Sequence, residues 1–219
     1  MDLDKNGIFK YNQRKGIISP SYTCFPNNIC QAWEILNNSE NCWKNVSGYH
    51  LEFNRIPDKL TYFMRFEPMM QNIYKFYFPN EFKIWHNDST RDQWLYSNNS
   101  YPPNELFKLM CLGFNMFINM NNGDDFKPKC TTKSLTIDEI IAEIQNGKPV
   151  VASFKLGELS HIMTIKGYEN DKLIVYDTYD CSFLKDYDTL NYGKVIKFQD
   201  FIKLCKPVNN EKKFCICFL

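Results

Sequence analysis

The sequence predicts an α+β fold, in which helices dominate the N-terminal part and a mostly antiparallel sheet forms the C-terminal part. Apolar residues recur at helical spacing within residues 29–36 and again within 105–119. From Val150 onward the pattern changes to short apolar runs separated by polar turns, which is typical of strands joined by hairpins. This segregation favours α+β, and the 219 residues suffice for the core of a single domain.

The first expected helix begins near Cys24 and ends at about Leu36. Its apolar face contains Ile29, Ala32, Trp33 and Leu36. Thr23 can cap this helix, and Pro26 suits its first turn. Cys24 therefore stands at a helix N-terminus, where the dipole and unpaired amides favour a thiolate and can stabilise an oxyanion on a substrate carbonyl. Cys30, deeper among apolar neighbours, is expected to be a core thiol.

The middle of the chain is rich in aromatic residues. Residues 45–99 intersperse Tyr, Phe and Trp with Met, Asn and Asp, a composition more typical of a core than of a ligand site. A helix is expected over Glu105 to about Asn119, and another opens at Ser134–Glu139 and ends before Gly147. The acidic loop 121–125 lacks the spaced ligands of a calcium site, so we interpret it as a solvated turn.

The stretch from Gly147 to Tyr179 carries the clearest strand signals. Three strands are expected, at Val150–Phe154, Ile162–Gly167 and Leu173–Tyr176. His161 opens the second strand and Asp177 follows the third, so antiparallel pairing would bring these two side chains within hydrogen-bonding distance. An imidazole oriented by a carboxylate can act as a general base. The alternative is a buried histidine near a strand end and an aspartate that starts a turn. The remaining expected elements are strands at 194–198 and 214–219 and a short helix at 200–204.

Charge and hydropathy exclude several classes of partner. Twenty-six Lys and Arg against 25 Asp and Glu leave a net charge of +1, which favours neither a nucleic-acid nor a membrane partner. No apolar run approaches the roughly 18 residues that span a bilayer. The first ten residues lack the basic and apolar regions of a signal peptide. We therefore expect a soluble chain, either cytoplasmic or the trimmed form of a secreted protein.

The cysteines and histidines do not form a metal-binding pattern. None of the nine cysteines belongs to a CxxC pair, and the three histidines, His50, His86 and His161, lie far apart. This spacing argues against a structural zinc site, and we expect no metal and no cofactor. Cys215 and Cys217 alternate along the last expected strand, as small residues on one buried face do.

Several of these residues together resemble a known family. A Gln, a Cys-x-Pro that opens a helix, then GKPVV, a Ser-His entering a strand, a Gly-Tyr turn and a strand ending in Tyr-Asp are similar to the papain-like cysteine peptidases of the C39 and C39-like group. The resemblance covers about Tyr11–Leu36 and Ile137–Pro207. It implies one papain-like domain over residues 1–219, in which 45–125 form an unmatched, helical and aromatic-rich insertion.

The resemblance also implies roles for individual residues. The implied roles are nucleophile for Cys24, base for His161, orienting acid for Asp177 and side-chain oxyanion donor for Gln13. Asp180 is the alternative acid, and the alternative for Gln13 is an exposed polar loop residue. The sequence departs from the family pattern at two points. Phe25 stands where a Gly usually follows the cysteine, and Gln13 precedes Cys24 by 11 residues, more than in compact members.

The expected activity is hydrolysis of a peptide bond in a peptide or protein substrate, through a thioester formed on Cys24. Two alternatives remain at this point. The same Cys-His pair could serve a peptidoglycan amidase or an acyltransferase, because the triad sets the reaction type but not the substrate. The second alternative is a catalytically inactive binding module, with the aromatic-rich middle as its partner surface. Retention of Cys, His and Asp together argues against this alternative.

Overall fold

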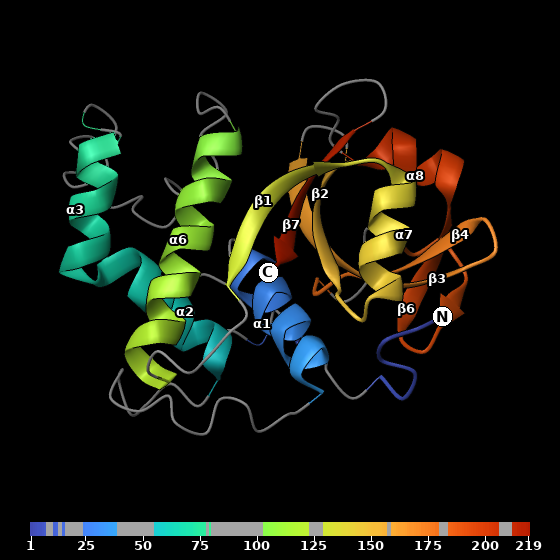
Figure 1. The fold of residues 1–219 in the computed structure, drawn as a ribbon, viewed down its shortest axis with the longest axis horizontal. Coiled ribbons are helices and arrows are strands. Elements are labelled where there is room, and N and C mark those ends of the chain that lie inside the picture. The colour runs from blue at the N-terminus through green and yellow to red at the C-terminus, as the bar shows by residue number, and fades with distance from the viewer. Residues whose placement is uncertain are drawn as a thin grey trace.

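The computed structural model describes residues 1–7, 11–12, 15, 24–38, 55–77, 79, 103–122, 129–156, 159–179, 184–205 and 212–219. Helices gather on one side of the molecule, and a curved sheet with two further helices forms the other side (Figure 1). Helix α1 (Cys24–Asn37) lies between the two parts. This arrangement of helices and an antiparallel sheet confirms the predicted α+β class.

The helical side contains α2 (Ile56–Phe66), α3 (Pro68–Tyr77) and α6 (Pro103–Asn122) in addition to α1. Helix α2 ends at Phe66, and Glu67 after it is extended, because the residue before a proline is disfavoured in the helical conformation. Pro68 then begins α3, where its missing N–H costs no hydrogen bond. The expected helix at 105–119 is thus observed as α6, and α2 and α3 add helices to the aromatic-rich middle.

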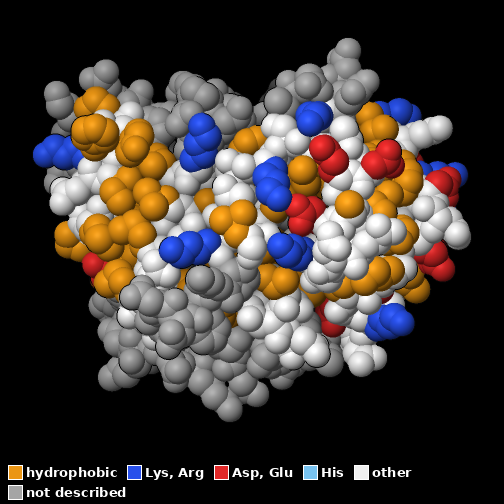
Figure 2. Space-filling model, viewed as in Figure 1, with side chains coloured by type: hydrophobic (Ala, Val, Ile, Leu, Met, Phe, Trp, Pro, Cys, Tyr) orange, Lys and Arg blue, Asp and Glu red, His pale blue; other side chains and the backbone are white. Residues whose placement is uncertain are grey.

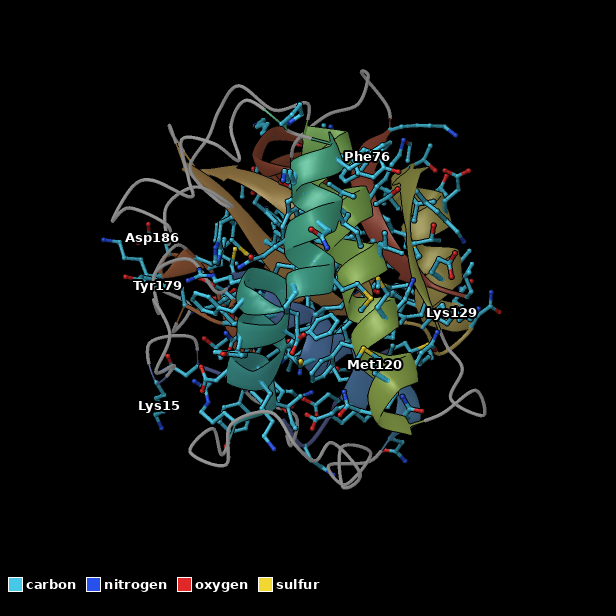
Figure 3. All side chains as sticks on the ribbon, turned by 90° about the vertical axis from the view of Figure 1, so that its left-hand side faces the viewer. Lys15, Phe76, Met120, Lys129, Tyr179 and Asp186 are labelled. Carbon is cyan, nitrogen blue, oxygen red and sulfur yellow. The ribbon has the colours of Figure 1, made fainter. Side chains whose placement is uncertain are left out.

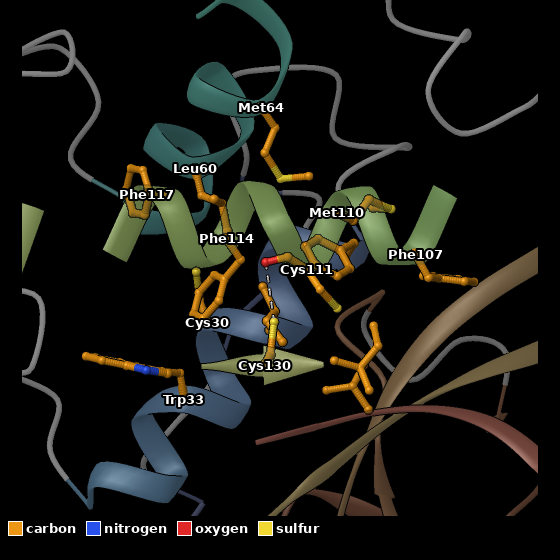
Figure 4. Packing of buried hydrophobic residues seen from close by; sticks show 14 of the residues in the cluster. Cys30, Trp33, Leu60, Met64, Phe107, Met110, Cys111, Phe114, Phe117 and Cys130 are labelled. Carbon is orange, nitrogen blue, oxygen red and sulfur yellow. Dashed lines mark hydrogen bonds between the residues drawn. The ribbon is translucent and has the colours of Figure 1, made fainter. Parts of the chain in front are cut away.

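Apolar side chains from α1, α2, α3 and α6, together with side chains from the sheet, form the core of the helical side (Figure 4). The contributing residues include Cys30 and Trp33 of α1, Leu60 and Met64 of α2, and Phe114 and Phe117 of α6. Cys30 is fully buried in this cluster, which confirms the expectation of a core thiol.

One antiparallel sheet contains the described strands, in the order β1-β7-β2-β3-β4-β6-β5. Their bounds are β1 (Cys130–Leu135), β2 (Val150–Leu156), β3 (Leu159–Glu169), β4 (Lys172–Tyr176), β5 (Thr189–Leu190), β6 (Gly193–Lys197) and β7 (Lys213–Phe218). Strands β2, β3 and β4 are consecutive neighbours, as the hairpin pattern predicts. Strand β7, the last along the chain, inserts between β1 and β2.

Each face of the sheet covers a separate core. Along β7, Phe214, Ile216 and Phe218 face the helical side, whereas Cys215 and Cys217 face α7 (Ile137–Gln145) and α8 (Phe198–Leu204). This alternation follows from the two-residue period of a strand, and it confirms that both cysteines are core residues.

A capping box starts α7 at the position that the sequence predicts. The Thr136 side chain accepts a hydrogen bond from the Glu139 amide, and the Glu139 carboxylate accepts one from the Thr136 amide. Gly147 follows the end of the helix with φ +78°, a conformation in which glycine is unstrained.

The sequence patterns do not predict strands β1 and β5. Only Cys130 and Leu135, the two ends of β1, are buried, so this edge strand lacks an apolar alternation. Strand β5 has two residues, too few for any periodicity. His50 and His86 lie outside the described residues, as does the part of the acidic loop beyond Asn122, where α6 ends.

The N-terminal segment lies along β3 at a break in its pairing with β4. The β3–β4 register shifts between Ile165 and Gly167, and Asp2 forms a bridge with Gly167. A Cβ atom at Gly167 would lie 2.5 Å from the Met1 carbonyl oxygen and 2.9 Å from the Asp2 Cα. Glycine at this position therefore makes the close approach of the two backbones sterically feasible.

Charged side chains of both signs are intermixed on the face drawn in Figure 2. Apolar side chains gather over α3, where Met69, Phe76 and Tyr77 are exposed. No described helix combines the length and the hydropathy that crossing a bilayer requires.

Candidate active site

Cys24 is the first residue of α1 and the only one of its first turns that is not buried. Residues 25 to 35 of the helix are buried, whereas Cys24 is partly exposed. Among the cysteines that the structure describes, the other six are all buried. Cys24 is therefore the one cysteine in the described part of the chain that is partly exposed to solvent.

Phe25, the residue that departs from the family pattern, points into the protein. Its side chain is fully buried in the core of the helical side. The phenyl ring therefore adds to the packing of α1 and leaves the Cys24 thiol partly exposed.

His161 lies on β3, paired with Phe154 on β2, and is 6% exposed. Its Nε2 lies 2.6 Å from Oδ1 of Asp177. The side chain of Cys24 also interacts with the imidazole and raises its pKa. Because Nε2 of His161 is hydrogen-bonded to Asp177, the other ring nitrogen, Nδ1, is available to the Cys24 thiol. The structure thus brings the side chains of Cys24, His161 and Asp177 together in one place.

Asp177 follows β4 directly and is 1% exposed. Its Oδ1 also accepts a hydrogen bond of 2.8 Å from the backbone amide of Tyr179. The ring of Tyr179 meets the imidazole of His161 edge to face, with 6.5 Å between the ring centroids. The carboxylate is held in place by the turn that follows β4, so it fixes the orientation of the imidazole.

The pairing of β3 with β4 explains why the two residues meet. Thr164 pairs with Tyr176, so the residues that follow β4 lie beside the start of β3. Side chains two residues apart share one face of a strand, which places the Asp177 carboxylate diagonally across from the imidazole. This is the juxtaposition that the hairpin spacing predicts.

The surroundings of His161 change its pKa in opposite directions. Burial lowers the pKa, because a charged imidazolium loses hydration. The hydrogen bonds to Asp177 and Cys24, and the charges of these two groups, outweigh burial and raise the pKa to about 9. The raised pKa favours the imidazolium, the form that can pair with a thiolate.

Gln13 and Asp180 lie outside the described residues. The two residues before Gln13 are held by neighbouring elements. The Tyr176 hydroxyl donates to the Tyr11 carbonyl at 3.2 Å, and Arg55 donates to the Asn12 carbonyl at 3.0 Å. The chain that leads to Gln13 is thus fixed near the end of β4. Figure 3 shows Lys15 and Tyr179 on the same side of the molecule, opposite Lys129.

Sequence reasoning missed Asn28, which is fully buried on α1. Its side-chain amide donates to the carbonyl oxygens of Cys24 and Ile162. The available signal was a polar residue on the buried face of the helix, four residues after the cysteine.

The residues described contain no group of three or more His, Cys, Asp and Glu side chains that could hold a metal ion. A model of the Peptidase_C39 like family matches residues 79–203, more than half of the chain. The matched range contains His161 and Asp177, whereas Cys24 and Gln13 precede it. No curated protein and no solved structure matches the chain.

Proposed function

This chain belongs to the Peptidase_C39 like family, and on that premise we propose that it is a cysteine peptidase with Cys24, His161 and Asp177 as its triad. The observation that carries the proposal is the position of His161, which hydrogen-bonds Asp177 through Nε2 and also interacts with the Cys24 side chain. This is the nucleophile, base and orienting acid that acyl transfer requires. The family supports activity of the cysteine-peptidase type, and the α+β fold is the papain-like one.

The first half of the reaction forms a thioester. The Cys24 thiolate attacks the carbonyl carbon of the scissile bond, a C–S bond forms, and the carbonyl oxygen becomes an oxyanion. The Cys24 backbone amide at the start of α1 is the proposed first donor to this oxygen, and Gln13 is the proposed second donor. His161 then protonates the leaving nitrogen, the C–N bond breaks, and the amine product departs.

The second half releases the acid. Neutral His161 takes a proton from water, and the resulting hydroxide attacks the thioester carbonyl. The C–S bond breaks, the carboxylic acid leaves, and the thiolate and the imidazolium are restored. Asp177 keeps the imidazole in one orientation through both halves, because its Oδ1 is itself held by the Tyr179 amide.

Turnover of a fluorogenic peptide library tests the proposal. Cys24→Ala is expected to abolish hydrolysis, because no thioester can form. His161→Ala removes the general acid and base and lowers kcat/KM by roughly 100- to 10,000-fold. Asp177→Ala leaves both reacting groups in place and gives a smaller, partial loss.

Thermal melts of the three variants show whether the fold persists. Hydrolysis by purified Cys24→Ala at the wild-type rate would overturn the proposal. If the protein cleaves amide bonds of peptidoglycan and no library peptide, the assignment of the triad stands and the substrate is peptidoglycan. A folded wild-type protein that cleaves neither would favour the binding module.

A further inference from the structure

Asn28 makes an unusual set of hydrogen bonds at the junction of three elements. Its Nδ2 lies 2.8 Å from the Cys24 carbonyl oxygen, 2.7 Å from the Ile162 carbonyl oxygen and 2.9 Å from the Thr178 hydroxyl. Asn28 is fully buried, and Thr178 is as well. One amide group therefore connects the first turn of α1, strand β3 and the turn after β4.

The orientation of this amide is fixed by its partners. The Thr164 hydroxyl donates to Oδ1 of Asn28 at 2.9 Å, so the oxygen faces Thr164. The carbonyl oxygens of Cys24 and Ile162 only accept hydrogen bonds, so the nitrogen must face them. A flipped amide would set oxygen against oxygen at both carbonyls. The group is thus locked in one rotamer.

Each acceptor lies in, or next to, the proposed triad. Cys24 is a triad member, Ile162 follows His161, and Thr178 follows Asp177. The amide joins the backbone of the nucleophile to the backbone that carries the base, over 134 residues of sequence. We infer that Asn28 is a positioning residue, whose amide holds the Cys24 thiol within hydrogen-bonding distance of the His161 imidazole.

This inference rests on the proposed function, because it concerns the reactivity of the same cysteine. Removing the amide leaves the Ile162 carbonyl without this donor in a buried site, and α1 can then shift against β3. A longer gap between thiol and imidazole weakens the hydrogen bond and the charge interaction that favour the ion pair. Cys24 would then react with alkylating agents as an ordinary thiol does.

Asn115 provides a matched control. Asn115 connects α6 to β1, as Asn28 connects α1 to β3. Its Nδ2 donates a hydrogen bond of 2.9 Å to the Cys130 carbonyl oxygen, and its Oδ1 accepts one of 2.9 Å from the Cys130 amide. Asn115 contacts no triad residue in these bonds. A variant at this position therefore reports the loss of a helix–strand anchor alone.

The test measures alkylation of Cys24 by iodoacetamide across pH, by mass spectrometry, in wild type, Asn28→Ala and Asn115→Ala. Wild-type Cys24 is expected to react rapidly near pH 6.5, well below the value of about 8.5 for a free thiol. In Asn28→Ala we expect the pH profile of Cys24 alkylation to move to higher pH. The alkylation rate near pH 6.5 then falls about tenfold for each pH unit of that shift. In Asn115→Ala the melting temperature falls and the profile stays in place.

Thr164→Val gives a second variant in case Asn28→Ala does not fold. It keeps the Asn28 amide and removes the donor that orients it, so a smaller shift in the same direction is expected. An Asn28→Ala or Thr164→Val protein whose Cys24 profile matches wild type would overturn the positioning role. Absence of peptide turnover in wild type would overturn the peptidase proposal alone, since the alkylation profile does not depend on turnover.

Discussion

At the scale of single residues, the candidate site depends on His161. This side chain is almost completely buried, yet its pKa is raised to about 9. Burial alone would lower it, so the rise reflects the partners on both sides, Asp177 and Cys24. A buried imidazole with one carboxylate and one thiol as neighbours is what an activated nucleophile needs.

The titration of His161 gives a prediction with a definite sign. Its pKa in the folded chain, about 9, exceeds the ordinary value of 6.5. Protonation of His161 therefore stabilises the folded chain fully below about pH 6.5, and this stabilisation is lost as pH rises through about 9. Peptidase activity that needs the imidazolium should decline over the same upper range.

An NMR titration of the imidazole resonances measures this pKa directly. The wild-type midpoint is expected near 9, and in Cys24→Ala it should be lower, because that variant loses a hydrogen bond and a charge that raise the pKa. A His161 midpoint near 6.5 in both proteins would contradict the account.

The sequence predicted the meeting of His161 and Asp177, because one hairpin sets their separation. It also placed Cys24 at a helix start, which is a local feature. The contribution of Asn28 could not be predicted in this way. Its amide donates hydrogen bonds to Ile162 and Thr178, which lie 134 and 150 residues away along the chain. No local sequence pattern predicts a contact over that separation.

At the scale of elements, the site is formed where α1 packs against β3. Helix α1 presents Cys24 at its partly exposed start, whereas residues 25 to 35 are buried. Strand β3 presents His161, and the turn after β4 presents Asp177. The relative placement of these elements therefore determines the geometry of the site.

Strand β3 is held from its other end by the N-terminal segment, and Gly167 tests that contact. In Gly167→Ala the new Cβ would lie 2.5 Å from the Met1 carbonyl oxygen, so one backbone has to move. We expect a loss of about 1–3 kcal/mol in the free energy of unfolding, as for overpacked sites. Urea denaturation measures this loss.

Gly113→Ala on α6 is the matched control. Its new Cβ would meet the Met70 side-chain end at 2.9 Å, a flexible group that can shift. Alanine also favours the helix over glycine by about 1 kcal/mol, so little net change is expected. Equal stability of Gly167→Ala and wild type would show that the N-terminal segment does not constrain β3.

At the scale of the whole molecule, the local patterns were sufficient for the fold class and for most strands. Helical and strand periods occupy separate stretches, and they recur in the structure as a helical side and an antiparallel sheet. The strand order was not predictable. Strand β7 pairs with β1 and β2, and such long-range pairing depends on tertiary packing and not on local spacing.

Strand β1 shows why some elements have no sequence signal. It forms one edge of the sheet, and its four central residues are not buried. The strand pairs with β7 along its whole length, so backbone hydrogen bonds define it. A single domain over residues 1–219, with 45–125 as an insertion, stays a prediction.

Cys24 and His161 are proposed to form an activated pair, and the whole site depends on it. The most direct measurement is the pH dependence of Cys24 alkylation in wild type and in His161→Ala, read site by site by mass spectrometry. The six other described cysteines are buried and serve as internal controls in the same digest. We predict that wild-type Cys24 is labelled rapidly at a pH well below about 8.5, the pKa of a free thiol, and that this rapid labelling is lost in His161→Ala. Slow labelling that is indifferent to His161 would contradict it.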